Sequence, residues 1–265
     1  MALYDPARHG VGGLTGLAYG ALSLWHLGMG DTALARVEQT VALARRFGRL
    51  FYLAWAFVQE SSVLRFVRRE SELQRQRAAE LIALSEAQAF PFFQGIGHVH
   101  HGAARVAAGD VSGLSEILDG LARLADTESR VAAPGLAGIL AEAQRSAGLL
   151  AEAQTSVAAG LALSAQTGQH YTDADLHRLE GELLLAQGGA SDAGAERYQQ
   201  ALATARAQDS RALELRAATS LARLWHGEGR SAEARALLAP LYGWFTEGHG
   251  TGDLIEAKAL LDELR

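Results

Sequence analysis

Apolar residues recur at helical spacing along most of this chain, and the clearest example is the segment 169–208. The leucines in its first half fall on one face of an α-helix, at Leu176, Leu179, Leu183 and Leu184. Gly188 and Gly189 follow, and glycine readily adopts the left-handed conformation in which many helices end. The pattern therefore predicts a helix that stops at this glycine pair.

A second helix is predicted directly after the glycine pair. Ser191 and Asp192 offer oxygens that would cap the free amide groups of its first turn. Its apolar face carries mostly small residues, which let two helices approach closely: Ala195, Tyr198, Ala201, Leu202 and Ala205. The two helices form a hairpin that cannot bury its apolar face alone, so we expect neighbouring hairpins of the same shape.

Turn signals of this kind recur at an even spacing. Their markers lie 39, 40, 39, 40 and 41 residues apart, at Gly30, Arg69, Gly109, Gly148, Gly188 and Gly229. A period of about 40 residues is in the range of helical-repeat solenoids and exceeds the roughly 34 residues of a tetratricopeptide repeat. The second helices also repeat a small, apolar, small spacing, as in Gly194, Tyr198 and Ala201, which resembles the Ala/Phe/Ala positions of that repeat.

We therefore predict an all-α fold, a right-handed α-solenoid of about six tetratricopeptide-like hairpins in a single domain over residues 1–265. No stretch alternates convincingly as a strand. The hairpins are expected at 10–47, 50–89, 91–125, 129–167, 169–208 and 209–246. An amphipathic helix at 253–264 is expected to cap the open end of the stack.

Composition narrows the classes of function. The formal net charge of −6 argues against bulk nucleic-acid binding, which needs a basic surface. No apolar run approaches the roughly 20 residues of a membrane span, and the N-terminal sequence lacks a signal-peptide pattern. The chain has no cysteine, so disulfides are excluded and we expect a cytoplasmic protein. Lys258, the only lysine, has no glycine loop before it, which argues against a phosphate-binding lysine motif.

The strongest candidates for site chemistry are the histidines of the segment HVHH. His98 and His101 share a helix face and have the spacing of metal ligands, but no acidic residue or cysteine lies within the next turn. We therefore expect solvated or hydrogen-bonded histidines, with no metal and no other cofactor. The motifs of serine hydrolases, zinc proteases and P-loop enzymes are absent from the sequence, so catalytic activity is not expected.

Candidate binding residues come from aligning the first helices on the turn markers. The positions fifteen, eleven and eight residues before each marker form one stripe, and first helices usually line the concave binding surface of stacked hairpins. The stripe is polar in the third and fifth hairpins, and its residues there, with Tyr19 of the first hairpin, are the predicted partner-binding residues: Tyr19, Gln94, His98, His101, Asp173, His177 and Glu180. In the alternative interpretation this stripe packs between repeats and another face is concave.

Three parts of the chain resemble a known family. They are ALYDPARH (2–9) with the segment 21–45 that follows it, GQHYTDADLHRLEGELLL (168–185), and the closing segment 236–264. Together they are similar to the C-terminal repeat region of bacterial STAND-type signalling ATPases, which are often fused to a class III adenylate or guanylate cyclase or to a kinase domain. The resemblance implies a tetratricopeptide-like sensor that regulates an upstream catalytic domain, and no such domain is in this sequence.

We expect a non-catalytic module that binds a protein or peptide partner on its concave face. One alternative is a sensor of a small effector, with a closed pocket between repeats. Another is a structural module that forms a homodimer through an apolar edge at Leu241, Trp244 and Phe245. An open groove would favour the peptide binder, and an enclosed pocket would favour the effector sensor.

Overall fold

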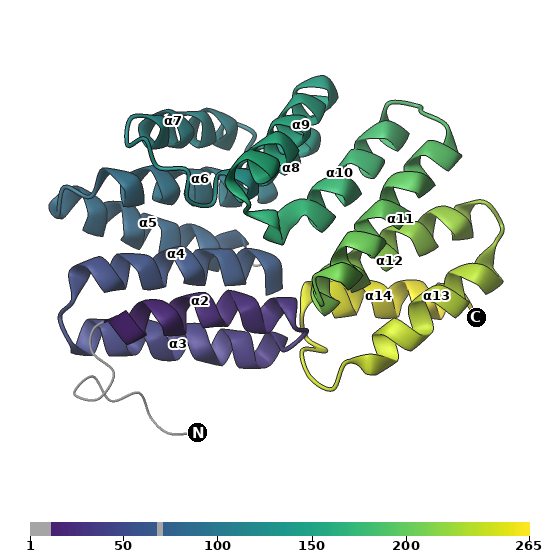
Figure 1. Cartoon of the computed structure of the whole chain (residues 1–265), viewed down its shortest axis with the longest axis horizontal. Helices are drawn as coiled ribbons and strands as arrows, with labels where there is room; N and C mark the ends of the chain where they lie inside the picture. The colour runs from purple at the N-terminus through teal and green to yellow at the C-terminus, as the bar shows by residue number, and fades with distance from the viewer. Residues whose placement is uncertain (1–11, 68–70) are drawn as a thin grey trace.

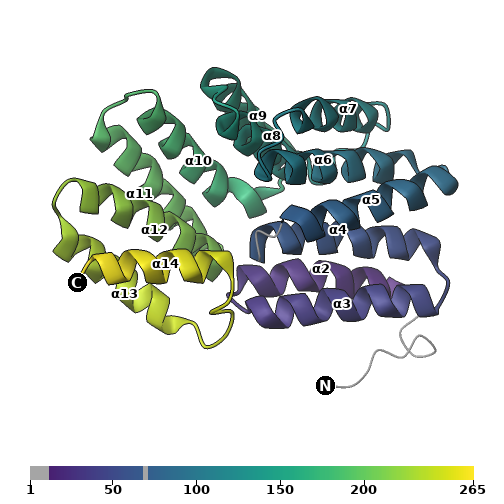
Figure 2. The same cartoon turned by 180° about the vertical axis from the view of Figure 1, so that it is seen from behind.

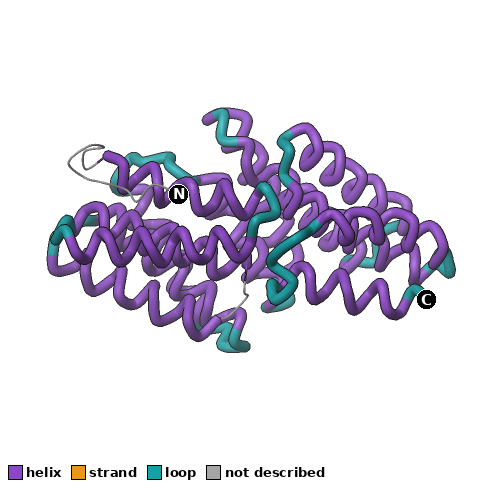
Figure 3. The backbone as a smooth tube through the Cα atoms, turned by 90° about the horizontal axis from the view of Figure 1, so that it is seen from below, coloured by secondary structure: helices purple, strands orange, loops and turns teal. Residues whose placement is uncertain are grey.

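The computed structural model describes residues 12–67 and 71–265. Within these ranges the chain forms thirteen α-helices and one short 3₁₀-helix and contains no strand (Figures 1 and 3). The predicted all-helical fold is confirmed. The motif at 2–9, the first residues of the first predicted hairpin and the turn marker Arg69 lie outside the described residues.

Twelve of the helices form six consecutive pairs, as the period of the sequence predicts. In chain order the pairs are α2 (Gly12–His26) with α3 (Gly30–Arg46), α4 (Leu50–Val67) with α5 (Ser71–Ala87), α6 (Pro91–Ala107) with α7 (Gly113–Ala125), α8 (Ala133–Ser146) with α9 (Leu150–Thr167), α10 (Asp173–Ala186) with α11 (Ser191–Ala207), and α12 (Arg211–Gly227) with α13 (Ser231–Trp244). The 3₁₀-helix η1 (His170–Thr172) leads into α10, and α14 (Gly252–Glu263) closes the chain.

In the turns inside the pairs, glycines adopt the backbone conformation that ends the first helix. Gly148 and Gly188 have φ angles of 78° and 80°, in the left-handed region that costs glycine little. The predicted caps of α11 are wrong, however. Ser191 is already inside the helix, the residue before it makes no side-chain cap, and the Ser191 hydroxyl instead donates to Glu228 in the next turn along.

Packing within a pair is closest between α6 and α7, where glycines replace side chains at the contact. A Cβ atom placed on Gly113 would lie 2.3 Å from the carbonyl oxygen of Gly102. A Cβ on Gly120 would lie 2.7 Å from the carbonyl oxygen of Gly95. The small, apolar, small spacing of the sequence, which includes Gly113, Ile117 and Gly120, therefore marks a true helix contact, and Ile117 between the glycines is fully buried.

Successive pairs stack so that the first helices contact one another in order, from α2 through α4, α6, α8 and α10 to α12. These helices form an inner layer, and the second helices lie outside it (Figure 1). In the part of the chain that the structure describes, no helix has the length and apolar character of a membrane span. The inner layer is the surface on which side chains from all six pairs face one another.

The two ends of the array meet, which the sequence does not indicate. The backbone N–H and the hydroxyl of Thr32 donate to the Glu247 carboxylate at 3.0 and 2.8 Å, and the Gly248 N–H donates to Asp31 at 2.9 Å. Helix α14 packs on α12 and α13, as a capping helix should, but it also contacts α4 from the other end of the chain (Figure 2). The first helices therefore surround a central space instead of an open groove.

Candidate binding site

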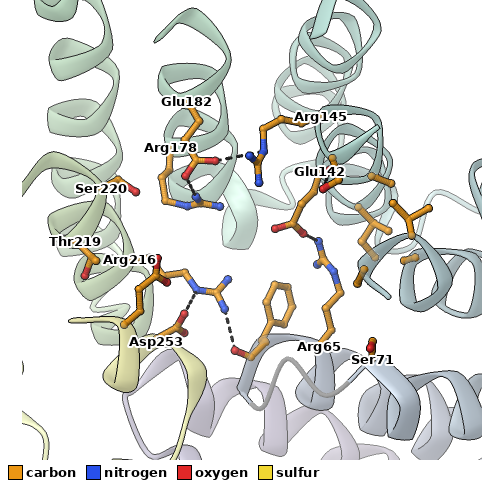
Figure 4. Close-up of a pocket in the computed structure, with 18 of the residues that line it drawn as sticks. Arg65, Ser71, Glu142, Arg145, Arg178, Glu182, Arg216, Thr219, Ser220 and Asp253 are labelled. Carbon is orange, nitrogen blue, oxygen red and sulfur yellow. Dashed lines mark hydrogen bonds and ion pairs between the residues drawn. The ribbon is translucent and has the colours of Figure 1, made fainter. Parts of the chain in front are cut away.

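The larger of two central cavities has a volume of about 410 Å³ and a charged wall, and we call it the arginine cavity. It is lined from α4, α5, α6, α8, α10, α12 and α14, so elements of both halves of the chain contribute to it. Among the described residues, five arginines and four carboxylates line it: Arg65, Arg145, Arg178, Arg216 and Arg223, with Glu142, Glu182, Asp253 and Glu256. The labelled arginines approach the same space from four different helices (Figure 4).

Ion pairs connect these groups across helices. Arg65 donates to Glu142, and Arg216 donates to Asp253 at 2.8 Å. Arg178 donates to Glu182 at 2.5 Å and to Asp175, just behind the wall, at 2.7 Å. A further donor group of Arg216 bonds the Phe66 carbonyl oxygen at 2.8 Å (Figure 4). Since Arg216 and Phe66 are 150 residues apart, this contact helps to hold the two ends of the array together.

The arginines keep the carboxylates of Glu142 and Asp175 ionised. Burial by itself raises the pKa of Glu142 and of Asp175. The positive charge of Arg65 beside Glu142, and those of Arg178 and Arg216 beside Asp175, lower both pKa values, and the net shift of each is downward. The wall of the cavity is therefore charged at neutral pH.

The second cavity has a volume of about 280 Å³ and a mostly apolar wall, and we call it the apolar cavity. It lies between α2, α4, α6, α8 and the segment 169–172. Five aromatic rings line it: Tyr19, Trp55, Phe66, Phe92 and Tyr171. Tyr171 is held neutral over a wide pH range, because burial raises its pKa to about 12.

Two histidines in the wall of the apolar cavity are also neutral. Burial, reinforced by the charge of Arg65, lowers the pKa of His100 to about 3. Burial and the nearby Arg216 lower the pKa of His26 to about 4. The His26 Nδ1 atom lies 2.8 Å from the Ser210 hydroxyl oxygen, and the His100 Nε2 atom lies 3.5 Å from that of Ser62. The cavity therefore presents neutral rings at physiological pH.

The two cavities adjoin, because Arg65, Phe66 and Ile139 line both of them. The Phe66 ring lies between two guanidinium groups, 5.1 Å from that of Arg65 and 5.3 Å from that of Arg216. Such cation–π contacts stabilise the charged groups next to an apolar surface. Charged and apolar binding surfaces therefore meet at the C-terminal end of α4.

Only one of the residues predicted to bind a partner lines a cavity. Tyr19 lines the apolar cavity and is 42% exposed. The other six line neither cavity: Gln94, His98, His101, Asp173, His177 and Glu180. Five of them contact α5, η1 or the second helix of their own pair, and His177 contacts Glu180 on its own helix. Their role in partner binding stays a prediction.

His98 and His101 contact the second helix of their own pair. Their Nδ1 atoms lie 3.2 and 2.9 Å from the Glu116 carboxylate on α7, to which Arg105 also donates at 3.1 Å. Burial raises the pKa of Glu116, but the hydrogen bonds from His101, His98 and Arg105 lower it, and the net shift is downward. The cluster ties α6 to α7 and faces away from the central space.

The residues that line the arginine cavity were missed by the sequence analysis. Arg178 lies one position, and Glu182 and Arg216 lie two positions, from the predicted stripe, and one residue along a helix turns the side chain by about 100°. Arg65 and Arg145 lie beyond the last stripe positions of their helices, and Asp253 is on α14. The sequence does contain a signal for the apolar cavity. A polar run, Gln59 to Ser62, interrupts an otherwise apolar helix, and Gln59 and Ser62 line that cavity. No regular offset from the turn markers identifies the arginines.

The predicted oligomer edge is partly used within the chain itself. Phe245 is 8% exposed, and both Phe245 and Trp244 come so close to Gly28 that a Cβ atom there would lie 2.8 Å from each ring. Trp244 remains 48% exposed, and the Arg211 guanidinium lies 5.2 Å from the centroid of its ring. Leu241 is half-buried. This contact belongs to the junction of the two ends, and the homodimer stays a prediction.

Comparisons with known proteins identify the fold. No protein-family model matches the chain, and no curated protein sequence matches it. Among solved structures it is similar to the apo form of RapI, with a TM-score of 0.62 and 10% identity over 97% of this chain and 88% of that one. It is also similar to PH0952 from Pyrococcus horikoshii, a STAND protein with a tetratricopeptide repeat sensor, with a TM-score of 0.52 and 13% identity over 94% of this chain.

These similarities show a tetratricopeptide-like repeat fold. The chain spans 37% of the length of the Pyrococcus horikoshii protein, a little over a third. The sequence identities are too low to carry anything beyond the fold.

Proposed function

We propose that this chain is a non-catalytic helical-repeat module that binds a short segment of a partner protein in the central space between its first helices. The observation that carries the proposal is the pair of adjoining cavities, which side chains of all six first helices line. Cavities of roughly 300 to 1,000 Å³ with an apolar wall and a few polar groups are typical of ligand sites. Rigid helices hold these side chains in place, which favours specific binding.

The closure of the array limits the length of the bound segment. The bonds of Asp31 and Thr32 to Gly248 and Glu247 join the first pair to the loop after the last one. A long extended peptide would need an open groove, whereas a few residues fit the volume of the two cavities. The proposal is therefore a short peptide segment.

A small effector is the second candidate ligand, and the same closure favours it. The space is bounded on several sides by helices from both halves of the chain, as a pocket for a small molecule would be. Binding of such an effector would raise the thermal midpoint, because the ligand binds only the folded state.

For the biological role we propose the sensor region of a larger cytoplasmic signalling protein with an ATPase, cyclase or kinase domain. The resemblance of the segments 168–185 and 236–264 to that family supports the role, as does the similarity in fold to a STAND protein whose sensor consists of tetratricopeptide repeats. Ligand binding in the central space would alter how the two ends meet, and this change would reach the upstream domain.

A selection with blocked variants tests the proposal. Random seven-residue peptides on phage are selected on the wild type. Each enriched peptide is then measured on Val131→Trp, which fills the apolar cavity, and on Ala103→Trp, which fills the arginine cavity. Val131 lines the apolar cavity and is 45% exposed, so the larger ring fits without disturbing a core. Val111→Trp is the matched control, since Val111 is 57% exposed on the α6–α7 turn and lines neither cavity.

We expect enriched peptides to bind the wild type and the control equally and to lose at least about tenfold in affinity on the blocked variants. Equal binding to all four proteins would place the peptide site elsewhere and overturn the proposal. If no peptide is enriched while a metabolite library yields a molecule that stabilises the wild type and the control but not the blocked variants, the effector takes the place of the peptide.

A further inference from the structure

We infer that the ligand of this site carries a large apolar group next to a carboxylate, with the apolar group in the apolar cavity and the carboxylate on the arginines at its border. The inference rests on the proposed function, because it names the chemistry of the ligand for the same site. Two kinds of molecule have this chemistry: a peptide whose last residue has a large apolar side chain, and a free organic acid with an aromatic or branched body.

The apolar cavity is large enough for a ring system or a branched chain. An apolar cavity of about 150 Å³ holds benzene, and this one has a volume of about 280 Å³. Trp55 and Phe92 lie 5.7 Å apart between ring centroids, and both line the wall. Aromatic rings at such distances accept another ring in an edge or offset arrangement. Among the described residues, the wall contains one charged side chain, Arg65, at the border with the arginine cavity.

The arginines next to this border can bind a further anion. Arg145 has the weakest internal partner of the group: its Nε atom lies 3.5 Å from Glu182, is buried and makes no hydrogen bond. Glu182 is bound more closely by Arg178, at 2.5 Å. Each guanidinium has five N–H donors arranged to bind a carboxylate through two of them. Donors therefore remain on Arg145 after the ion pairs within the protein have formed.

Arg65 and Arg145 are placed to act on the same anion. Arg65 pairs with Glu142 and Arg145 pairs with Glu182, and both guanidinium groups line the arginine cavity (Figure 4). Arg65 also lines the apolar cavity. A ligand whose apolar group fills that cavity therefore brings its carboxylate to this pair of arginines.

A cationic ligand fits the site less well. The carboxylates that line the arginine cavity already have arginine partners: Arg65 for Glu142, Arg178 for Glu182, Arg216 for Asp253 and Arg223 for Glu256. A cation would have to displace an arginine that is itself held by the protein. A ligand carboxylate would only have to accept hydrogen bonds from arginine N–H groups that have no acceptor within the protein.

The test compares acids with their neutral amides on the same apolar body. The free acids are 4-phenylbutyrate, indole-3-propionate and octanoate, and the peptide arm is acetyl-Ala-Ala-Phe with a free or an amidated C-terminus. Affinities are measured by isothermal titration calorimetry on the wild type, Arg145→Gln, Arg145→Lys and Val131→Trp. Arg123→Gln on α7 is the matched control, since it removes an exposed arginine that lines neither cavity.

We expect at least one acid to bind the wild type about tenfold more tightly than its amide. Arg145→Gln should bring that acid to the level of the amide, Arg145→Lys should restore part of the difference, and Val131→Trp should weaken acid and amide alike. The Arg145 side chain is 36% exposed, so its replacement should leave the fold intact, which the helical circular dichroism signal checks. Tighter binding of the tripeptide acid identifies a peptide end as the source, and tighter binding of a free acid identifies a small molecule.

Two results overturn the inference. In one, the amides bind as well as the acids, so that the arginines do not select a carboxylate. In the other, no acid binds the wild type at all. If the selected peptides still lose their binding on Val131→Trp in either case, the ligand class is wrong but the proposed function stands. If the selection fails as well, both fall.

Discussion

The two central cavities share the helices α4, α6 and α8, yet different interactions hold their walls together. The arginine cavity is held by ion pairs between helices that are far apart in sequence, such as Arg65 on α4 with Glu142 on α8. The apolar cavity is held by aromatic packing, and its two histidines are neutral. The contrast shows that one repeat architecture can present two kinds of surface side by side. It also means that the two halves of the site should respond differently to mutation and to pH.

The largest effect is expected from breaking the arginine network at its centre. Arg216→Ala removes a side chain that is only 9% exposed, leaving Asp253 and the Phe66 carbonyl oxygen without that donor. Breaking a buried ion pair on one side costs about 4 kcal/mol, and we expect urea denaturation to show a loss of this size in the free energy of unfolding.

Arg223→Ala is the matched control for this variant. It removes an arginine of the same helix that is 51% exposed and pairs with Glu256 at 2.7 Å. An exposed ion pair of this kind contributes less than about 1 kcal/mol. Equal losses for the two variants would show that the central network does not hold the ends of the array together.

A smaller, pH-dependent effect on the free energy of unfolding is expected from replacing the neutral histidines of the apolar cavity. The pKa of His100 falls from 6.5 in the unfolded chain to about 3 in the folded one, so between these values only the unfolded chain binds the proton. Stability contributed by the neutral ring is therefore complete above pH 6.5 and is lost as the pH falls toward 3. For one group the slope is at most about 1.4 kcal/mol per pH unit.

His100→Gln should make the free energy of unfolding fall less steeply between pH 6.5 and pH 4.5, as measured by urea denaturation at several pH values. His26→Gln should act in the same direction, since the pKa of His26 is lowered to about 4. A slope in the His100 variant as steep as in the wild type would mean that this ring is not kept neutral by the fold.

The smallest effect on stability is expected from disrupting the cluster of His98, His101 and Glu116, which lines neither cavity. Glu116→Gln removes the carboxylate that His98, His101 and Arg105 share, and we expect a loss of about 1 kcal/mol, because this cluster is partly exposed. Binding of the peptides selected on the wild type should not change. A loss of that binding without a loss of helicity would favour the stripe predicted from the sequence over the cavities as the binding surface.

Much of the fold could be predicted because its signals are local. The spacing of Leu176, Leu179 and Leu183 reports one face of a helix, and these three residues are buried in the structure. The turn markers Gly148 and Gly188 adopt the left-handed conformation in which many helices end. Ser191 does not cap α11 as predicted, because a cap depends on one or two residues of register, and its hydroxyl donates to Glu228 instead.

Less of the site could be predicted, because it depends on how each helix is rotated about its axis. His98, His100 and His101 are neighbours on one helix, but only His100 lines a cavity, and the other two contact Glu116 on α7. Periodicity identifies the apolar face of a helix, but a helix inside a stack contacts neighbours on several sides. Which of these sides is concave depends on the neighbours.

By itself, the sequence determined the number and order of the helix pairs, because helix spacing and glycine turns act over a few residues. The tertiary structure alone decided which side chains face the centre and that the two ends meet. Arg216 reaches the Phe66 carbonyl oxygen across 150 residues of chain, and no local pattern encodes such a contact. It exists because small rotations from one pair to the next add up until α12 and α14 arrive beside α2 and α4.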